Sequence, residues 1–514
     1  MNRGDGFVPG YGRGLIVSWA RFRPKGPLHT RHWFNFVPRY YALRHDLGRA
    51  RRHNRALDTG GREAIIDTID DLRRAWPPPS LVYPDEGYRR PAPADLTPVD
   101  ALPVGTNGCL AVFSDERAGR WCLPLVRELR EWRLATDADA LSVALTELLM
   151  TGPAASGGFR IPPTDFGGLS RPGRHHEHRV AGDQTHISAI VDDQLIVKWF
   201  SRPASPEVVG VRLHHLRSAG FTEMPRHYGE VTWQEGPSTT LVATVTQFLP
   251  DASDGWTWCV DALRAHLAHQ PTPCDTNSCP GWFAAELGAM LGRFHAAAAT
   301  PTSVLPEPVV WVEADEIAVW AERCAARVRE ALSVYRIELG DTGSLASLWA
   351  SGVERMACVE RAPTVVVHGD LHVGQILRST AGGELTIIDL EGDPLDSRPT
   401  AHESPLRDVA HLLTSVALVG EVAKRRIETT PEAIEDWAVQ SAELMLASYV
   451  ETMDSRGLAD LVDVRLVRPL VVERLASELV YSTRFLPRWA YAPLGLARSS
   501  WLARLPMEAS LSGA

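Results

Sequence analysis

The stretch Val365–Pro394, VVVHGDLHVGQILRSTAGGELTIIDLEGDP, places an acidic turn directly after each of two apolar runs. The run 364–367 is followed by His-Gly-Asp ending at Asp370, and the run 385–388 is followed by Asp389. A Gly-Gly turn lies between them, so the pattern predicts a strand, a loop, a short strand, a turn and a strand. Each outer strand would deliver a carboxylate at its polar end, which suits a site that binds a divalent metal and activates a hydroxyl.

The spacing of three polar side chains in this stretch is more informative than either acid alone. Asp and Gly are common in turns for backbone reasons, so a single acidic turn favours a plain hairpin. Here Gln375 follows Asp370 by five residues, and Asp389 follows it by nineteen. In protein kinases a catalytic-loop Asp accepts the hydroxyl proton, an Asn five residues later holds metal, and a later Asp holds metal. The pattern therefore predicts a phosphotransferase with Asp370 as the catalytic base and Gln375 and Asp389 as metal ligands.

Three motifs carry a resemblance to a known family. The segments HGDLHVGQILR (368–378), IIDLEGDP (387–394) and SPLRDVA (404–410) resemble those of actinobacterial maltokinases, in the same order. Maltokinases belong to the wider family of aminoglycoside-phosphotransferase-like sugar kinases, which includes glucosamine kinases. The chain departs from the maltokinase pattern at Leu390, where that branch has Phe, and at Asp393, where it has Glu.

The resemblance covers residues 100–505 and implies an α+β, two-lobed protein-kinase-like (aminoglycoside phosphotransferase-like) fold. A length of 514 residues is itself too great for one compact core. We expect a basic, disordered extension and Pro-rich linker over 1–98 and an N-terminal cap subdomain over 99–178. The kinase N-lobe with its hinge is expected over 179–250, and a mostly helical C-lobe with the catalytic and metal loops over 251–514.

Composition excludes several classes of protein. The chain is 45% apolar and 23% charged, as in ordinary globular proteins. It has neither a run of about 18 apolar residues nor an N-terminal basic region followed by an apolar core, so we expect no transmembrane span and no secretory signal. Seven scattered Cys indicate a reducing compartment, and a net charge of −10 gives no reason to expect nucleic acid. We therefore expect a cytoplasmic enzyme, a monomer or weak dimer, that acts on a small molecule without nucleic-acid or membrane partners.

Residues 1–60 form a basic segment, with twelve Lys and Arg against three Asp and Glu. Aromatic residues and prolines interrupt any amphipathic pattern, which favours a disordered extension or a start site placed too far upstream. An arm that binds an anionic surface or nucleic acid is the alternative. A short helix is predicted over 63–76, and three prolines end it before a Pro-rich linker over 77–98.

Apolar patterning predicts the remaining elements. The runs 109–113 and 121–126 form one hairpin, and the runs 186–190 and 194–200 form another that turns at an Asp-Asp pair. An amphipathic helix is expected over 137–150. Further helices are predicted over 282–298, 314–332, 343–355, 431–453 and 466–486, with another that starts at 407.

Lys198 is the most informative residue of the second hairpin, in the strand LIVKWF. The chain has only three lysines, Lys25, Lys198 and Lys424, and this one lies between apolar neighbours. A fixed ammonium in such a strand is what a kinase uses to bind the α- and β-phosphates. The preceding segment GDQTHIS resembles the family's phosphate-covering turn, which implies nucleotide contacts from Thr185 and Ser188.

Other nucleotide contacts follow from the resemblance. A helix predicted over 206–219 is where the family places the Glu that pairs with the strand Lys, and Glu207 is the acid available there. An acid that complements the helix dipole explains Glu207 equally well. The apolar strand 241–249 would be the hinge, where backbone groups of Gln247 and Phe248 meet the adenine edge.

Three residues near the catalytic stretch are expected to support it. The resemblance implies that His368 holds the catalytic loop through backbone hydrogen bonds. It also implies that Arg407, together with Asp408, braces that loop. Glu391 either assists the metal site or only caps its turn.

The acceptor pocket is expected around aromatic residues near the C-terminus. The segment 481–493, YSTRFLPRWAYAP, resembles the maltokinase segment near the sugar pocket. Tyr481 and Trp489 could stack on a sugar ring, although ordinary core packing explains them equally well. His372, in the HGDLH motif, is the third expected substrate contact.

Together these motifs predict an ATP- and Mg²⁺-dependent sugar kinase, with maltose 1-phosphate as the leading product. The rival in the same class is an amino-sugar or aminoglycoside kinase, such as a glucosamine kinase. A cationic substrate would need carboxylates near the acceptor, and Glu403, Asp396 and Asp393 are candidates. A nucleotide-binding pseudokinase that serves as an interaction module is a further alternative, which the intact Asp370 and Asp389 argue against.

Overall fold

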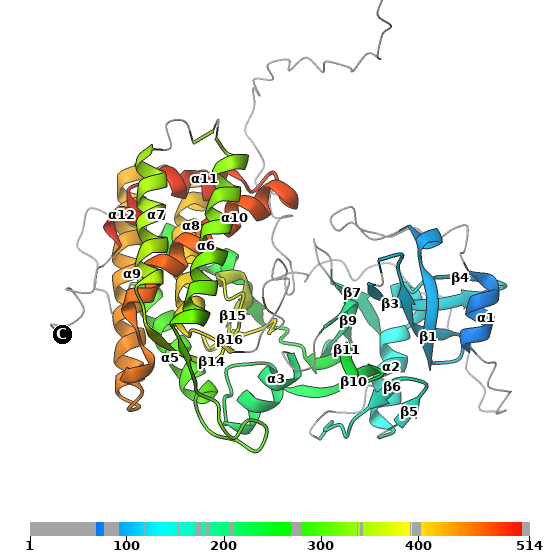
Figure 1. Cartoon of the computed structure of the whole chain (residues 1–514). Coiled ribbons are helices and arrows are strands. Elements are labelled where there is room, and N and C mark those ends of the chain that lie inside the picture. The colour runs from blue at the N-terminus through cyan, green and yellow to red at the C-terminus, as the bar shows by residue number, and fades with distance from the viewer. Residues whose placement is uncertain are drawn as a thin grey trace, which may run out of the picture.

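The computed structural model places a β-rich region beside a lobe of long helices (Figure 1). It describes residues 68–76, 92–117, 119–152, 154–167, 169, 176–180, 186–204, 209–268, 279–336, 338–339, 343–390, 392 and 402–505. The basic segment 1–60 and most of the Pro-rich linker lie outside the described residues. The described part of the helix predicted over 63–76 is α1 (Thr68–Ala75).

A four-stranded antiparallel sheet forms the N-terminal end of the described chain. Its strands follow one another in sheet order: β1 (Thr97–Val104), β2 (Gly108–Ser114), β3 (Arg120–Glu128) and β4 (Glu131–Leu134). β2 and β3 are the hairpin predicted from 109–113 and 121–126. Buried Leu72 of α1 packs with Phe113 and Trp121 on one face of this sheet. Its other face shares a core with the next sheet.

A seven-stranded sheet follows, and it carries Lys198. Its strands are β5 (Ala154–Ser156), β6 (Phe159–Ile161), β7 (Glu177–Arg179), β8 (Ile187–Val191), β9 (Leu195–Ala204), β10 (His227–Glu235) and β11 (Ser238–Gln247), in the order β5-β6-β10-β11-β9-β8-β7. The predicted Asp-Asp turn joins β8 to β9, with φ of +51° at Asp192 and +54° at Asp193. Two successive positive φ values match the right-handed twist of a hairpin, so this prediction is confirmed.

Two helices accompany these sheets, and both differ slightly from the predicted ranges. The segment predicted over 137–150 begins as a 3₁₀ turn, η2 (Asp137–Asp139), and α2 (Leu141–Met150) follows after Ala140 at φ +51°. The cause is local, because the Asp139 carboxylate accepts from the Thr136 backbone and from Arg133, which tightens the first turn. α3 (Val209–Ser218) is the described part of the helix predicted over 206–219.

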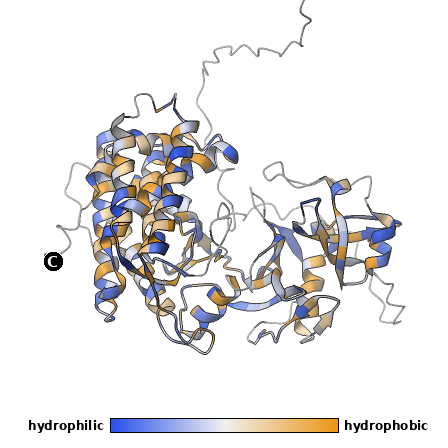
Figure 2. Ribbon diagram, viewed as in Figure 1, coloured by the Kyte–Doolittle hydropathy of each residue, from blue (hydrophilic) through white to orange (hydrophobic). Residues whose placement is uncertain are grey.

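The C-terminal lobe is built mainly from helices (Figure 1). They are α4 (Gly255–Ala268), α5 (Ala284–Ala298), α6 (Ala314–Val334), α7 (Gly343–Ala357), α8 (Leu406–Ala423), α9 (Pro431–Asp454), α10 (Val467–Arg484), α11 (Tyr491–Arg498) and α12 (Trp501–Arg504), with 3₁₀ turns η3 (Pro280–Trp282), η4 (Val373–Gln375), η5 (Ala459–Leu461) and η6 (Val464–Leu466). Apolar residues recur along their ribbons (Figure 2) and form one large core. α8 is the centre of that core, since nearly all its residues are buried.

Two small sheets hold the stretch that decides the fold. One contains β12 (Ala252–Ser253), β15 (Ile376–Ser379) and β16 (Leu385–Ile387), and the other contains β13 (Val310–Glu313), β14 (Arg361–Val366) and β17 (His402–Glu403). The predicted series of strand, loop, short strand, turn and strand is therefore confirmed as β14, the loop with η4, β15 and β16. Both acidic turns leave strands that are anchored in the core.

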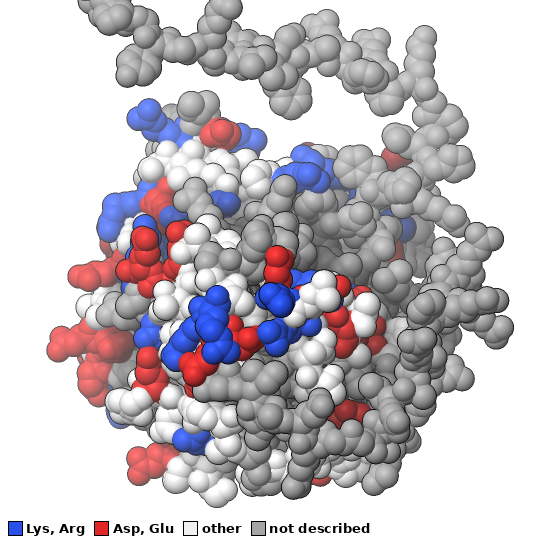
Figure 3. All heavy atoms as spheres, turned by 90° about the vertical axis from the view of Figure 1, so that its right-hand side faces the viewer, with Lys and Arg blue, Asp and Glu red and all other residues white. Residues whose placement is uncertain are grey.

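The mixture of charges on the surface and the hydropathy of the described helices are both as the composition predicts. On the face in Figure 3, basic and acidic side chains lie among one another. In the N-terminal sheet, for example, Arg133 pairs with both Glu128 and Asp139. Within the described ranges, none of the helices is both long and apolar enough to cross a membrane.

Candidate active site

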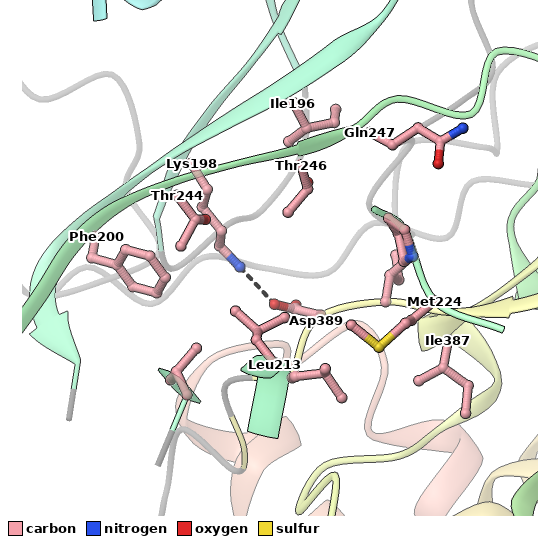
Figure 4. A pocket seen from close by; sticks show the side chains of 14 residues that line it. Ile196, Lys198, Phe200, Leu213, Met224, Thr244, Thr246, Gln247, Ile387 and Asp389 are labelled. Carbon is pink, nitrogen blue, oxygen red and sulfur yellow. Dashed lines mark hydrogen bonds and ion pairs between the residues drawn. The ribbon is translucent and has the colours of Figure 1, made fainter. Parts of the chain in front are cut away.

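Lys198, Gln375 and Asp389 meet where the seven-stranded sheet faces the helical lobe. Lys198 Nζ donates to Asp389 Oδ1 at 2.6 Å (Figure 4), and Gln375 Nε2 donates to Asp389 Oδ2 at 3.2 Å. Asp389 has a φ of +67°, a left-handed conformation that Asp tolerates better than most residues. The fold thus brings together Lys198 of β9, which was predicted to bind phosphate, and the two predicted metal ligands. These ligands are Asp389, which follows β16, and Gln375 of η4.

A cavity opens beside this cluster. β9 contributes Ile196 and Lys198 to its lining, β11 contributes Thr246, and the turn after β16 contributes Ile388 and Asp389 (Figure 4). Apolar walls with one charged end suit a flat base attached to phosphates.

The end of β11 was predicted to be the adenine-binding hinge, and the structure corrects part of this. The Gln247 N–H donates to the Arg226 carbonyl at 2.8 Å, and the Phe248 N–H donates to the Gln194 carbonyl at 2.8 Å. These two N–H groups therefore cannot donate to an adenine, because each already donates to a backbone carbonyl of the protein. Gln247 still lines the cavity, whereas the Phe248 ring packs into a small buried cluster that includes Ile196.

Ser188 lies within β8, directly opposite Lys198 of β9. Directly opposite residues of paired strands point to the same face, so the two side chains share the face toward the cavity. Ser188 is buried, and its Oγ has no hydrogen-bond partner among the described residues. It is therefore placed on a strand rather than in the turn that was predicted to cover the phosphates, yet it keeps a hydroxyl on the side of Lys198.

The catalytic loop is held by two buried groups. Asp408 of α8 accepts from the backbone N–H of His368 at 2.7 Å and of Gly369 at 2.9 Å. His368 Nε2 contacts the Ile388 carbonyl at 2.8 Å, and its Nδ1 accepts from the Asp370 N–H at 3.3 Å. A neutral ring with the proton on Nε2 satisfies both contacts. These bonds join the loop of Asp370 to the turn of Asp389.

The ionisation of these groups follows from their partners. Burial alone would raise the pKa of Asp408, but bonds from His295 and from the Gly369 N–H hold that pKa below its ordinary value. His295 in turn contacts the Tyr449 hydroxyl at 3.0 Å. Burial lowers the pKa of His368. A buried carboxylate and a neutral imidazole thus support the loop.

Asp370 contacts Arg474 of α10, and Arg474 in turn pairs with Glu478 of the same helix. Arg474 Nη1 donates to Asp370 Oδ1 at 2.9 Å, and Arg474 Nη2 lies 2.6 Å from Glu478 Oε1. The three side chains are only 9–15% exposed. Two carboxylates surround one guanidinium, so this trio carries a net charge of −1 when all three are ionised.

Aromatic rings lie close to the same loop. Trp256 packs edge-on against Trp489 with ring centroids 4.8 Å apart, and it lies 6.4 Å from the His372 ring. Burial, with smaller effects from Arg474 and His368, lowers the pKa of His372 to about 3. Its Nδ1 accepts from the Gly374 N–H within the loop.

Tyr481 follows Glu478 on α10 and contacts Phe485, with ring centroids 5.0 Å apart. The Trp489 ring also packs against Tyr491 at 5.8 Å. Two of the three expected substrate residues, His372 and Trp489, are therefore connected through the Trp256 ring.

Arg407 differs from the expectation that it braces the catalytic loop. It donates to Glu403 at 3.1 Å and to Glu473 at 3.3 Å, and Arg323 donates to the same two carboxylates. Asp408 alone of the expected pair makes the loop bonds described above. Glu403 was also a candidate for a cationic substrate, but two arginines already bind it.

Several predicted residues lie outside the described part of the chain. They are Thr185, Glu207, Glu391, Asp393 and Asp396. Their expected roles toward phosphate, Lys198, metal and substrate remain predictions.

Arg474 and Glu478 are the functional candidates that sequence reasoning missed. They are four residues apart on a long predicted helix, a spacing that is typical of an ordinary surface ion pair. Only the contact between Arg474 and Asp370 in space points to a role, and Arg474 lies 104 positions after Asp370 in the sequence. Tyr481 follows Glu478 by three residues on the same face of the helix, and that series of polar and aromatic residues was the available signal.

Comparison with known proteins agrees with this geometry. The sequence model of a phosphotransferase enzyme family (APH) matches residues 212–415. The glucosamine kinase of Streptacidiphilus jiangxiensis is 32% identical over 437 residues, which is 81% of this chain and 94% of that protein. The glucosamine kinase of Mycolicibacterium smegmatis (strain ATCC 700084 / mc(2)155) is 31% identical, over 77% of this chain and 96% of that protein.

Solved structures give the same result. A glucosamine kinase in complex with glucosamine, ADP and inorganic phosphate superposes with a TM-score of 0.65 at 28% identity, over 83% of this chain and 97% of that one. A second crystal form of glucosamine kinase gives a TM-score of 0.67 at 29% identity, over 82% of this chain and 97% of that one.

Proposed function

Because the chain belongs to the aminoglycoside-phosphotransferase-like (APH) family of sugar kinases, we propose that it transfers the γ-phosphoryl group of ATP to a hydroxyl of an amino sugar, with glucosamine as the leading substrate. The observation that carries this proposal is the meeting of Lys198, Gln375 and Asp389 beside the cavity. A cation, a carboxylate and a carboxamide at the charged end of an apolar cavity form a site for a nucleotide polyphosphate.

The nucleotide would lie with its base between the apolar walls and its phosphates toward Lys198. Lys198 would bind the α- and β-phosphates, and the Ser188 hydroxyl on the same sheet face can donate to a phosphate oxygen. Asp389 and Gln375 supply carboxylate and carboxamide oxygens, the ligands that Mg²⁺ prefers. Mg²⁺ held by these two residues would offset the negative charge that develops on the transferring phosphoryl group.

Asp370 is the group that would accept the proton of the sugar hydroxyl. The hydroxyl oxygen forms a bond to the γ-phosphorus as the bond to the β,γ-bridging oxygen breaks, so the products are ADP and a sugar phosphate. Asp408 and His368 hold the loop that aims Asp370, so little reorganisation is needed at the moment of transfer.

The charge beside Asp370 supports an amino sugar over a neutral one. The trio of Asp370, Arg474 and Glu478 has two carboxylates against one guanidinium, and all three side chains are largely buried. The ammonium group of a protonated amino sugar would offset that charge, and a neutral sugar would not. Glu478 therefore replaces Glu403 as the proposed carboxylate for the amine, since Arg323 and Arg407 already bind Glu403. Trp256 and Trp489 offer apolar ring surface against which a pyranose can pack.

Maltose is the competing acceptor, because the motifs around Asp370 resemble those of maltokinases. The two readings are separated by ADP release with Mg-ATP against glucosamine, glucose, maltose and aminoglycosides, with Asp370→Asn as the inactive control. Turnover that is greatest on glucosamine and lost in the variant is expected. Turnover on maltose alone would move the proposal to the maltokinase branch. ATP binding without turnover on any acceptor would favour the pseudokinase alternative.

A further inference from the structure

His214, His227 and Glu230 converge between α3 and β10. Their ligand atoms all lie within 4.8 Å of one another. His214 Nε2 is 3.4 Å from Glu230 Oε2, and His227 Nε2 is 3.7 Å from the same oxygen. None of the three lines the nucleotide cavity. The cluster is therefore separate from the predicted Mg²⁺ ligands Gln375 and Asp389.

The polar atoms at the centre of this cluster are buried and lack hydrogen bonds. The His227 side chain is 6% exposed and the Glu230 side chain 11% exposed. His227 Nε2 and Glu230 Oε2 have no hydrogen-bond partner among the residues that the structure describes. A buried polar atom without a partner is costly, so such atoms usually mark a missing ligand, ion or water.

The nearby guanidinium of Arg217 does not take the place of a bound cation in this cluster. Arg217 is the nearby cation, and its Nη1 donates to the His227 backbone carbonyl at 2.8 Å. Its Nη2 donates to Asp165 at 2.9 Å, so the Arg217 charge is already paired. The Glu230 carboxylate is left with the two imidazoles.

We infer that His214, His227 and Glu230 bind a divalent transition metal of the Zn²⁺ class. Ligands placed 2.0–2.2 Å from a tetrahedral Zn²⁺ lie about 3.3–3.6 Å apart. The two distances to Glu230 already match this spacing closely. His214 is 44% exposed and can adjust to close the third edge. Two imidazoles and one carboxylate form a three-ligand set, and water would occupy the fourth position.

A metal here would tie α3 to the seven-stranded sheet. α3 also carries Arg212, whose Nη1 donates to the Leu390 carbonyl at 3.0 Å. Leu390 directly follows Asp389. The site would thus hold the helix that contacts the Asp389 turn, without lining the nucleotide cavity itself.

The test is metal binding by the full chain, made without a histidine tag and stripped with a chelator. Equilibrium dialysis against Zn²⁺ followed by elemental analysis should give one tightly bound Zn²⁺ per chain. Co²⁺ should give the intense visible bands of a four-coordinate site. His214→Ala and Glu230→Gln should each lower the affinity for Zn²⁺ by about 100-fold, at least as much as loss of an outer-sphere partner.

Two controls separate this site from others. His176→Ala, which removes an exposed histidine elsewhere, should bind Zn²⁺ as the wild type does. Asp389→Asn should also keep the bound Zn²⁺, because it alters only the nucleotide site. Zn²⁺ should raise the Tm of the wild type but not of His214→Ala. The inference is overturned if Zn²⁺ does not bind stoichiometrically, if His214→Ala binds it normally, or if Asp389→Asn loses it. None of these results depends on kinase activity.

Discussion

The carboxylate of Asp408 accepts a hydrogen bond from the backbone N–H of His368 at 2.7 Å, across 40 residues of sequence. Its second oxygen accepts from the Gly369 N–H at 2.9 Å, and Asp408 itself is fully buried in α8. The catalytic loop is therefore attached to the most buried helix of the C-terminal lobe. Because both oxygens are used, replacing either one affects the geometry of Asp370.

Asp408→Asn tests this attachment. The amide NH₂ would face a backbone N–H or His295, so a buried donor loses its partner, which costs about 1–3 kcal/mol of unfolding free energy. We expect kcat to fall together with stability, because the loop that aims Asp370 is no longer fixed. Urea unfolding and kcat measure the two effects. Asp436→Asn, at an exposed Asp that pairs with Arg504, is the matched control and should change neither. Unchanged kcat in Asp408→Asn would contradict the proposed role.

Lys198→Met tests the nucleotide site. Loss of the ammonium removes the contact with Asp389 and the proposed contact with the phosphates. Deleting one such electrostatic group lowers the rate by about 100- to 1,000-fold, so kcat/KM for ATP should fall by that factor. Lys424→Met is the control, since Lys424 pairs with Glu421 on α8 at 2.6 Å. Equal losses in both variants would indicate a general effect of removing lysine.

Glu478→Gln tests the selection of an amino sugar. The variant keeps the shape of the side chain but removes the excess negative charge beside Asp370. A charged hydrogen bond contributes about 1.5–3 kcal/mol, so KM for glucosamine should rise by about 10-fold or more. KM for ATP should not change, and the exposed Glu443→Gln provides the control. If KM for glucosamine stayed constant, the amine would have to bind elsewhere.

Glu177 makes the stability of the fold depend on pH. Its carboxylate accepts from the backbone N–H groups of Ser142 and Val143, but burial raises its pKa to about 7. A carboxyl group whose pKa is raised on folding favours the folded state at low pH, and this contribution is lost as the pH rises through about 7. The free energy of unfolding of the wild type should therefore fall relative to that of Glu177→Gln as the pH rises from 4.5 to 7.5.

The expected change is on the order of 3 kcal/mol over that range. Urea unfolding at several pH values measures it, and the comparison with Glu177→Gln cancels the contributions of other groups. A difference that does not vary with pH would show that Glu177 titrates normally in the folded protein.

The proposed catalytic and metal-binding residues were the part most accessible to sequence reasoning. Asp370, Gln375 and Asp389 lie within one stretch of strands and turns, so their spacing carries the chemistry without knowledge of distant contacts. The Asp192-Asp193 turn was equally clear, because two residues at positive φ between apolar strands specify a hairpin. Lys198 was identified from its rarity and its apolar neighbours.

The contacts between distant elements could not be read in this way. Arg474 and Glu478 have the spacing of an ordinary helical ion pair, and only the packing of α10 brings them to Asp370. Glu403 was a reasonable candidate for a cationic substrate until Arg323 was found beside it. The hinge N–H groups illustrate the same limit, because their carbonyl partners lie on other segments.

The sequence by itself therefore indicated the reaction class and the residues that are proposed to carry it, since these residues lie in one stretch with a recognisable spacing. The tertiary structure alone decided which charges lie beside Asp370, how Asp408 holds its loop and where His214, His227 and Glu230 meet. These features depend on side chains that are far apart in the chain and come together only when helices and sheets pack, so no local pattern encodes them.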